Sequence, residues 1–527
     1  MCGCGSEAGR HHGVQAGELT AAAEPGGSLS RRGFLAAATV AGAAGVAILA
    51  PVRFASAATG ATQTRTINGH FDIGAPDFVY VPVEVPNGVA QIDASYSYNR
   101  PSVPAGVLGN ALDIGMFDER GTALGKRAGF RGWSGGFRTS FSISNSDATP
   151  GYLPGPVNAG TWHVALGPYT VAPSGLDWTV QITLTSGPPG PAFQPDYPPL
   201  RAAGRGRAWY RGDSHLHTVY SDGRRLPSEV AAGARAAGLD FITSTDHNTS
   251  SSHAAWGPFA GSDLLIITGE EATTRNGHYV IAGLPAGTWI DWRYRARDGE
   301  LPGFIDQIHG TGAIAVAAHP FATCLACNWK FGYAKVDAVE VWNGPWTADD
   351  EIAVQMWDGM LVQAAHNGGQ WLPAMGDSDA HSEPQVIGLP HNVVLANDLT
   401  TDAIIAGLKA GRTWLAESSS VDLAFSAASG GKTAGIGERL DVGTGEPITV
   451  TLDVSGVPGG TAVLIADEGH TLSQALPASG AGTVTWQTTS DVSAYVRAEV
   501  RHPVSSQAAD LPGAMAGMTN PVFLGQA

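Results

Sequence analysis

Residues 211–223 read Arg-Gly-Asp-Ser-His-Leu-His-Thr-Val-Tyr-Ser-Asp-Gly, and after a helical run residues 241–248 read Phe-Ile-Thr-Ser-Thr-Asp-His-Asn. His215 and His217 are two residues apart, so both rings leave an extended strand end on the same side. Asp222 follows in a Ser-Asp-Gly turn. Residues 227–238 carry alanines and a Glu that suit a short helix, and residues 239–244 have the pattern of a buried strand. The stretch therefore predicts a β-α-β unit with His and Asp side chains at both strand ends.

The rest of residues 204–417 repeats this arrangement, which a chance His pair would not do. Strands and helices alternate, and one strand after another ends in a side chain that can bind a metal. Active sites of barrel-like and open α/β folds gather at the C-terminal ends of strands, so we expect these side chains to converge. The predicted metal ligands are His215, His217, Asp222, His247, Glu271, His278, His319, Asp379 and His381.

Imidazole and carboxylate together suit Zn, Mn or Fe. With roughly 3 to 5 protein ligands per ion once shared bridges are counted, the set could hold two or three divalent ions, with Glu271 as the bridging carboxylate. A water that bridges such ions has its pKa lowered from about 15.7 toward 7, and the resulting hydroxide attacks phosphorus or a carbonyl carbon. This chemistry needs no Ser or Cys nucleophile.

Other side chains near the ligands are candidates for supporting roles. Asp246, Glu340 and Asn343 could orient the imidazoles of the ligands. Arg224, Arg225 and Lys330 could bind a substrate phosphate, although each also fits an ordinary solvated charge. Four histidines outside the motifs are predicted to be structural or at the surface: His253, His309, His366 and His391.

The order His-x-His-x4-Asp, Thr-Asp-His-Asn, Gly-Glu-Glu, Gly-His, His-Pro and Asp-x-His resembles that of the polymerase and histidinol phosphatase (PHP) superfamily. The match spans residues 204–417 and contains every ligand type in order. The flanking regions and the export signal look more like the secreted branch that includes the carbaryl hydrolase type. The resemblance implies a distorted (β/α)7 barrel, a cluster of two or three metals and mostly phosphoester hydrolysis, while related members cleave carbamates or esters or act as nucleases. It also favours Glu271 over Glu270, because the family places its Glu directly before an apolar-Ser/Thr pair, here Ala272-Thr273.

Three functions are compatible with these motifs. We favour an exported metal-dependent phosphoesterase that acts on a small phosphodiester, a phosphomonoester or a nucleotide end. The alternative is a carbamate, ester or amide hydrolase on the same metals. A neutral aromatic substrate would suit the tryptophans near the motifs, which fit an ordinary core equally well: Trp256, Trp329, Trp342 and Trp346. A metal-dependent binding protein without turnover is the third, and the complete ligand set argues against it.

Length and charge limit the partners and the number of domains. The 527 residues predict two to four domains. The formal net charge of −17 argues against a protein that grips long nucleic acid, which needs a basic surface, and leaves a small-molecule substrate. The sequence gives no indication of the oligomeric state.

Two regions of strand character flank the central unit. Residues 58–203 and 418–527 lack helical periodicity and each predict a β-sandwich, and the proline-rich residues 188–199 predict a linker. Trp162 and His163 in the first region are predicted to be packing residues. His470 and His502 in the second are predicted to lie at the surface.

The N-terminus predicts export. Ser30-Arg31-Arg32-Gly33-Phe34-Leu35 precedes an apolar run over residues 33–50 and then Ala55-Ser56-Ala57, as in a twin-arginine signal over residues 1–57 that is cleaved after Ala57. A retained membrane anchor is disfavoured because the run is rich in Ala and Gly. The mature protein would then be secreted or associated with the cell envelope, without a membrane span. Cys2 and Cys4 would be removed, and in an exported protein Cys324 and Cys327 most simply form a local disulfide, a role at the rim of the site being the minor alternative.

Overall fold

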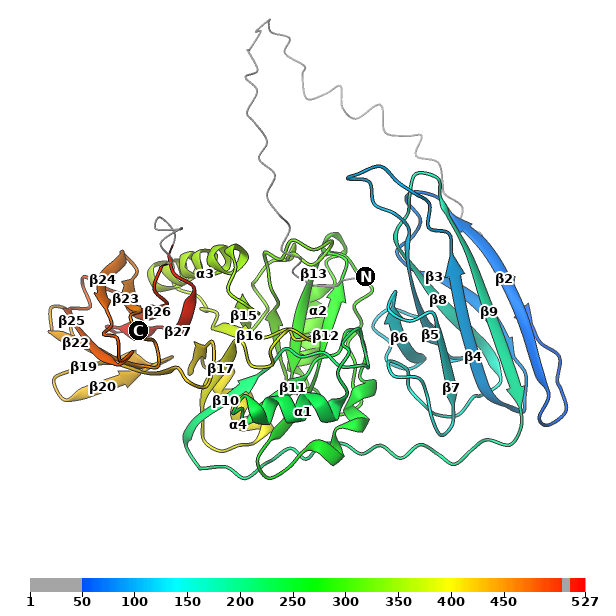
Figure 1. Ribbon diagram of the computed structural model, residues 1–527, viewed down its shortest axis with the longest axis horizontal. Coiled ribbons are helices and arrows are strands. Elements are labelled where there is room, and N and C mark those ends of the chain that lie inside the picture. The colour runs from blue at the N-terminus through cyan, green and yellow to red at the C-terminus, as the bar shows by residue number, and fades with distance from the viewer. Residues whose placement is uncertain (1–49, 505–511, 527) are drawn as a thin grey trace, which may run out of the picture.

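The structure is a computed structural model that describes residues 50–504 and 512–526. Most of the predicted export signal, including the twin arginines, lies outside the described residues. Figure 1 shows three regions: an N-terminal part (residues 52–186), a central part (residues 208–416) and a C-terminal part (residues 422–524). Among the described residues, no helix has the length and apolar character needed to cross a membrane. The predicted domain boundaries stay a prediction.

The N-terminal part consists of two sheets that share a core. One sheet has the strand order β1-β3-β8-β5-β6 and the other β2-β9-β4-β7. Alternate residues of β9, such as Leu176, Val180 and Ile182, are buried in the core between the sheets. Trp162 also lies in this core, whereas His163 points to the opposite face of its strand. The strands are β1 (Val52–Arg53), β2 (Thr62–Phe71), β3 (Val79–Val85), β4 (Val89–Tyr98), β5 (Ala111–Phe117), β6 (Phe130–Gly135), β7 (Ser140–Ser144), β8 (Gly160–Thr170) and β9 (Leu176–Ser186).

The central part is a curled mixed sheet whose strand order begins β16-β15-β14-β13-β12-β11-β10-β17-β18. A parallel bridge between Leu216, beyond β10, and Ala380, beyond β16, brings the far strands of the curl together. The strands are β10 (Ala208–Asp213), β11 (Phe241–Ser244), β12 (Leu265–Thr274), β13 (Gly277–Ala282), β14 (Ile314–Ala317), β15 (Ala338–Asn343), β16 (Ala374–Asp377), β17 (His391–Ala396) and β18 (Thr413–Ala416). The helices are α1 (Pro227–Ala236), α2 (Leu301–His309), α3 (Ala348–Asn367) and α4 (Thr401–Lys409), with short 3-10 turns η1 (Ser251–Ala255), η2 (Gly257–Phe259) and η3 (Ala296–Asp298).

The predicted distorted (β/α)7 barrel is not confirmed, because the described residues form a curled mixed sheet. β13 runs antiparallel to both β12 and β14, and β17 and β18 are antiparallel as well. Only Arg275 and Asn276 separate β12 from β13, and so short a connection makes a hairpin because a parallel crossover needs a dozen residues or more.

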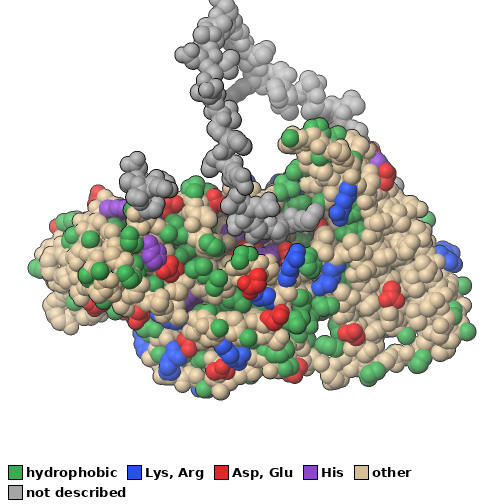
Figure 2. All heavy atoms as spheres, viewed as in Figure 1, with side chains coloured by type: hydrophobic (Ala, Val, Ile, Leu, Met, Phe, Trp, Pro, Cys, Tyr) green, Lys and Arg blue, Asp and Glu red, His purple; other side chains and the backbone are tan. Residues whose placement is uncertain are grey.

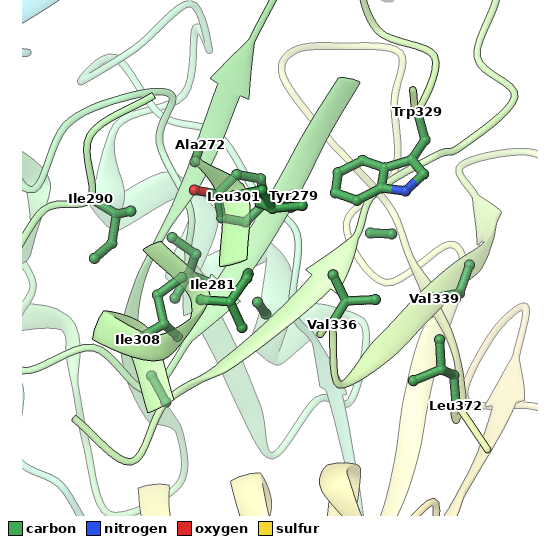
Figure 3. Close-up of a cluster of buried hydrophobic side chains, with 14 of the residues drawn as sticks. Ala272, Tyr279, Ile281, Ile290, Leu301, Ile308, Trp329, Val336, Val339 and Leu372 are labelled. Carbon is green, nitrogen blue, oxygen red and sulfur yellow. The ribbon is translucent and has the colours of Figure 1, made fainter. Parts of the chain in front are cut away.

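The two faces of the curled sheet carry different cores. Leu265 and Ile267 face the inside together with Val316 and Met375, and α4 adds Ile404 and Leu408 to that core. Residues between them in sequence face outward. Ile266 packs with α1, and Ile281 and Val339 belong to a cluster that includes α2 and α3. Figure 3 shows part of this outer cluster, with Leu301 and Ile308 of α2 beside Tyr279 and Ile281 of β13.

The C-terminal part adds a second layer to an extension of the central sheet. β27 pairs with β18, so that the central sheet continues through β27, β26, β23 and β24, while a separate sheet has the order β20-β19-β22-β25. The predicted C-terminal β-sandwich therefore shares one layer with the central part. The strands are β19 (Asp422–Ser429), β20 (Lys432–Gly435), β21 (Arg439–Leu440), β22 (Ile448–Ser455), β23 (Thr461–Ala466), β24 (Gly469–Ala475), β25 (Gly482–Thr488), β26 (Tyr495–Arg501), β27 (Met515–Thr519) and β28 (Val522–Leu524).

The N-terminal part packs against the central part through aromatic side chains. The Phe130 and Trp289 ring centroids lie 4.2 Å apart, and those of Trp133 and Trp292 lie 5.3 Å apart. Arg295 forms an ion pair with Asp77 across the same boundary. On the face shown in Figure 2, Lys and Arg side chains stand singly or in small groups among Asp and Glu.

Candidate metal centre

The nine predicted ligands converge at the end of the curled sheet where β10, β11, β14 and β16 finish. His215 and His217 follow β10, His247 follows β11, His319 follows β14, and Asp379 and His381 follow β16. Two of these residues have left-handed backbone conformations, with φ of 26° at His319 and 48° at Asp379. Such conformations are rare for residues other than glycine and are concentrated at functional sites.

Glu271 lies at the centre of the cluster. Its Oε2 is 3.3 Å from His215 Nε2, 3.4 Å from His217 Nε2 and 2.7 Å from His247 Nδ1. Its Oε1 is 2.9 Å from His278 Nδ1 and 3.1 Å from His319 Nε2. The strand alternation explains this position, because Glu271 shares the inner face of β12 with Leu265 and Ile267. A carboxylate in contact with this many imidazoles is placed to bridge ions.

Glu270 faces the other way, as the sequence interpretation required of one of the two glutamates. Its Oε2 accepts a hydrogen bond of 2.7 Å from the Ile290 backbone N–H on the outer side of the sheet.

A second group of ligands lies toward the solvent side. Asp222 Oδ1 is 3.4 Å from His247 Nε2 and 3.3 Å from His381 Nε2. The His217 ring stacks with both histidine rings, with centroid distances of 4.3 Å to His247 and 4.0 Å to His381, whose own centroids are 5.7 Å apart. Asp379 joins the two groups, since its Oδ1 is 3.3 Å from His215 Nε2 and 3.0 Å from His217 Nε2.

The donor atoms fall into overlapping sets of the size that a metal ion needs. In each of four sets, one ligand atom per residue lies within 4.8 Å of every other. The sets are His217-Asp222-His247-His381, His215-His319-Asp379, His215-His217-Glu271 and Glu271-His278-His319. Imidazole nitrogens and carboxylate oxygens at this spacing suit divalent transition metals.

Unpaired buried atoms provide an independent test of whether metals fit. Eight of the nine residues each have a buried ligand atom without a hydrogen-bond partner among the described residues, and those atoms are His215 Nε2, His217 Nε2, Asp222 Oδ1, Glu271 Oε2, His278 Nε2, His319 Nδ1, Asp379 Oδ1 and His381 Nε2. Buried polar atoms in folded proteins are almost always paired, since an unpaired one costs free energy. Metal coordination would satisfy these atoms together, so the residues fit the predicted ions.

The electrostatics of the cluster keep its carboxylates ionised. Burial alone would raise the pKa of Asp222, Glu271 and Asp379, but the neighbouring histidines lower each pKa below its usual range. Burial alone would lower the pKa of His247 and His381, but the carboxylates raise both to about 9. Burial and the charges of these two histidines lower the pKa of His217 to about 3. Protonated histidines therefore balance the carboxylate charges at the positions where cations would bind.

The three predicted orienting residues are close to the ligands, but only two touch them. Glu340 Oε1 is 3.0 Å from His215 Nδ1, and its Oε2 accepts hydrogen bonds from the His319 backbone N–H at 2.7 Å and from Asn343 Nδ2 at 3.0 Å. Asn343 Nδ2 also lies 3.4 Å from Asp379 Oδ2. Asp246 instead accepts hydrogen bonds from Thr218 and from Ser221 Oγ, so it holds the turn after His217 rather than an imidazole.

A cavity of about 500 Å³ opens beside Asp222, His247 and His381. Of the three basic side chains predicted to bind a substrate phosphate, only that of Arg224 belongs to a residue that lines the cavity. Arg225 does not line the cavity but is held by Glu383 and by the Gln385 carbonyl, two residues of its rim. Lys330 is exposed and does not line it.

The sequence analysis did not identify a further basic side chain at this cavity, that of Arg275. Arg275, in the turn between β12 and β13, lines it and is fixed by a hydrogen bond of 3.0 Å to the Tyr169 carbonyl and by the Tyr169 ring, 4.2 Å away. Its position between two ligand strands was the available signal.

The aromatic lining also differs from expectation. Trp256, Trp329 and Trp342 are buried core residues, and none of the four tryptophans near the motifs lines the cavity. Trp133 and Phe78 of the N-terminal part and Trp292 of the central part line it instead. No sequence pattern links Trp133 to motifs so distant along the chain.

The other histidines that the sequence analysis set aside from the ligands have ordinary environments. His253 and His391 are buried, while His309, His366 and His502 contact Asp337, Asp467 and Glu417. His470 is exposed. Cys324 and Cys327 form a disulfide in the loop after His319, and Tyr169 of the N-terminal part donates a hydrogen bond to Leu325 between them.

No protein-family model matches the chain, and no curated protein matches it significantly. Among solved structures, a two-domain protein from Bacteroides vulgatus containing a predicted PHP-like metal-dependent phosphoesterase is similar over 63% of this chain and 100% of its own, at 16% identity and a TM-score of 0.34. An amidohydrolase from Chromobacterium violaceum with bound sulfate and no metal matches 34% of this chain and 89% of its own, at 17% identity and a TM-score of 0.24. A protein from Bifidobacterium adolescentis proposed to be a metal-dependent phosphoesterase matches 36% of this chain and 92% of its own, at 18% identity and a TM-score of 0.22. At these TM-scores the likenesses carry no argument about function, which rests on the site itself.

Proposed function

We propose that the protein is a metal-dependent hydrolase of the PHP type that holds two or three divalent cations, Zn, Mn or Fe. One observation carries the proposal: eight buried ligand atoms without partners converge from separate strand ends beside an open cavity. Bound there, the cations would supply an activated water at neutral pH and Lewis acidity toward the scissile group.

The chain's own residues position that chemistry. Glu271 and Asp379 hold the imidazoles in one cluster, and Glu340 fixes the His215 ring through Nδ1 and leaves Nε2 directed at Glu271 and Asp379. Asn343 ties Glu340 to Asp379. The inner core of the curled sheet covers the side of the ligands that faces away from the cavity, so that substrate approaches from the cavity side.

We favour a phosphoester substrate because two guanidinium groups, Arg224 and Arg275, line the cavity. Guanidinium groups suit phosphate oxygens through paired hydrogen bonds. The aromatic residues of the same cavity support the second candidate, an ester, carbamate or amide with an apolar group. Export by the twin-arginine route, and membership of the secreted branch with the carbaryl hydrolase type, belong to the proposal as well.

Two substrates test the choice. The metal-loaded protein is assayed on bis-p-nitrophenyl phosphate and on a naphthyl carbamate, with Glu271→Gln as the control for contaminating activity. We expect turnover of the phosphodiester that Glu271→Gln lacks. Turnover of the carbamate alone would replace the first candidate with the second, and turnover of neither would leave the metal centre without a hydrolytic role.

A further inference from the structure

The wall of the cavity that faces the ligands comes from the N-terminal part. Trp133, Asp113 and Phe78 line the cavity opposite Asp222, His247 and His381. On β5, Leu112, Ile114 and Met116 enter the core of the N-terminal part, so the residues between them face the central part. Asp113 is one of these outward residues.

The Trp133 ring is held in a fixed position. A Cβ atom added at Gly115 would lie 2.4 Å from Trp133 Cε3, and one added at Gly167 would lie 3.0 Å from Cη2. Two glycines thus leave the space that the indole fills on the sheet. Phe78 and Trp292 contact its other sides, with ring centroids 5.8 Å and 5.3 Å away. Only 4% of the residue's surface is exposed, so a small part of a firmly held ring borders the cavity.

Asp113 is a largely buried residue whose carboxyl group lines the cavity. Only 7% of its surface is exposed, and within the described part of the chain its side chain makes no hydrogen bond, although the positive charge of Arg275 acts on it. Burial raises its pKa. A carboxyl group that lines a cavity and makes no hydrogen bond within the described protein can gain one from a bound molecule.

We propose that the N-terminal part supplies the specificity subsite of the enzyme, in which Trp133 packs against the aromatic ring of an aryl ester and Asp113 hydrogen-bonds to a polar group on that ring. This inference rests on the proposed hydrolase function, since the scissile bond would lie at Asp222, His247 and His381. The volume of about 500 Å³ is in the range of small-molecule sites and accommodates an aromatic ring together with the reacting group.

Non-hydrolysable probes separate the subsite from the metal centre. Binding of phenylphosphonate and methylphosphonate to the metal-loaded protein is measured by calorimetry. The two probes share the anionic group and differ in the ring. We expect phenylphosphonate to bind about tenfold more tightly, and Trp133→Leu to remove that preference without weakening methylphosphonate. Trp209→Leu, at a partly exposed tryptophan of β10 outside the cavity, is the matched control and should keep the preference.

Binding of 1-naphthol to the metal-free protein isolates the subsite. We expect it to weaken in Trp133→Leu and, by several-fold, in Asp113→Asn, and to be unchanged in Asp93→Asn, which lies on β4 outside the cavity. If Trp133→Leu does not fold, as judged by circular dichroism, Asp113→Asn alone decides.

The outcomes are distinct. Equal binding of both phosphonates, with 1-naphthol binding absent or insensitive to Trp133 and Asp113, would overturn the subsite and leave the metal centre standing. Naphthol binding that depends on Trp133 and Asp113, without phosphonate binding, would support the subsite and count against the proposed phosphoesterase.

Discussion

Two groups of buried histidines in the central part differ in how their nitrogens are paired. His253 Nε2 lies 2.7 Å from the Gly269 carbonyl, and its Nδ1 accepts a hydrogen bond of 3.0 Å from the Gly287 backbone N–H. His391 contacts the Gly388 carbonyl at 2.9 Å and Arg211 Nη1 at 3.0 Å. In the metal centre, by contrast, His215, His217 and His278 are equally buried and each leaves Nε2 without a partner.

The contrast extends to charge. Burial lowers the pKa of both His253 and His391 to about 4, so each is a neutral packing residue. Carboxylates instead raise the pKa of His247 and His381 to about 9. Burial alone therefore does not identify a ligand. A ligand is a buried histidine that keeps one nitrogen unpaired and faces carboxylates.

The largest expected effect comes from the carboxylate at the centre of the cluster. Glu271→Gln removes the negative charge that faces five imidazoles, so bound metal should be lost and hydrolysis should fall on the order of 10³-fold or more. The neighbouring Glu270→Gln keeps an oxygen acceptor for Ile290 and should retain both. Steady-state kinetics and metal content of the two variants check this. Equal losses in both variants would contradict the assignment of Glu271, and not Glu270, to the ligand face of β12.

An intermediate effect is expected for a residue that orients a ligand. Glu340→Gln weakens the contact to His215 Nδ1 without removing a ligand atom, so metal affinity or activity should fall about 10- to 100-fold. Competition with a chelator measures the affinity. An unchanged affinity and rate would mean that His215 needs no such support.

The pH dependence follows from the raised pKa values. At neutral pH the metal-free protein holds His247 and His381 protonated, and a cation must displace those protons, so affinity should rise by up to about tenfold per proton for each pH unit until pH 9. The stability of the metal-free protein runs the other way. Because their pKa is raised, His247 and His381 contribute to the free energy of unfolding. This contribution is complete below their ordinary pKa of 6.5 and is lost as the pH rises through 9. Calorimetric titration and denaturant unfolding between pH 6 and 9 measure the two trends, and an affinity independent of pH would contradict them.

The smallest effect on the metal centre is expected from a paired histidine. His253→Gln should cost about 1–3 kcal/mol of unfolding free energy because it disturbs two buried hydrogen bonds. It should not change the metal content. Denaturant unfolding and metal analysis check both statements, and loss of metal without loss of stability would place His253 among the ligands.

The convergence of the candidate ligands could be predicted largely from sequence because its information is local. His215 and His217 follow one strand, and strand alternation places Glu271 inside and Glu270 outside. Asp246 was expected beside an imidazole on the same reasoning, but proximity in sequence to His247 did not reveal its bonds to Thr218 and Ser221.

The curled mixed sheet, found where a barrel was predicted, and the far wall of the cavity did not follow from the sequence in the same way. The hairpin at Arg275 and Asn276 replaces a crossover that the strand-and-helix pattern suggested. Trp133 and Asp113 reach the cavity only because the N-terminal part packs on Trp289 and Trp292, a long-range contact without a local signature. The short connection between β12 and β13 decided the hairpin, whereas packing between distant segments decided the far wall of the cavity.

Metal content per chain tests the central claim most directly. The purified protein is loaded with Zn, Mn or Fe, dialysed and analysed by mass spectrometry, alongside His215→Ala and His391→Gln. We predict two or three equivalents in the wild type and in His391→Gln, and a clear loss in His215→Ala. A wild-type protein that retains no metal after loading, or a His215→Ala variant that retains the full complement, would contradict the account.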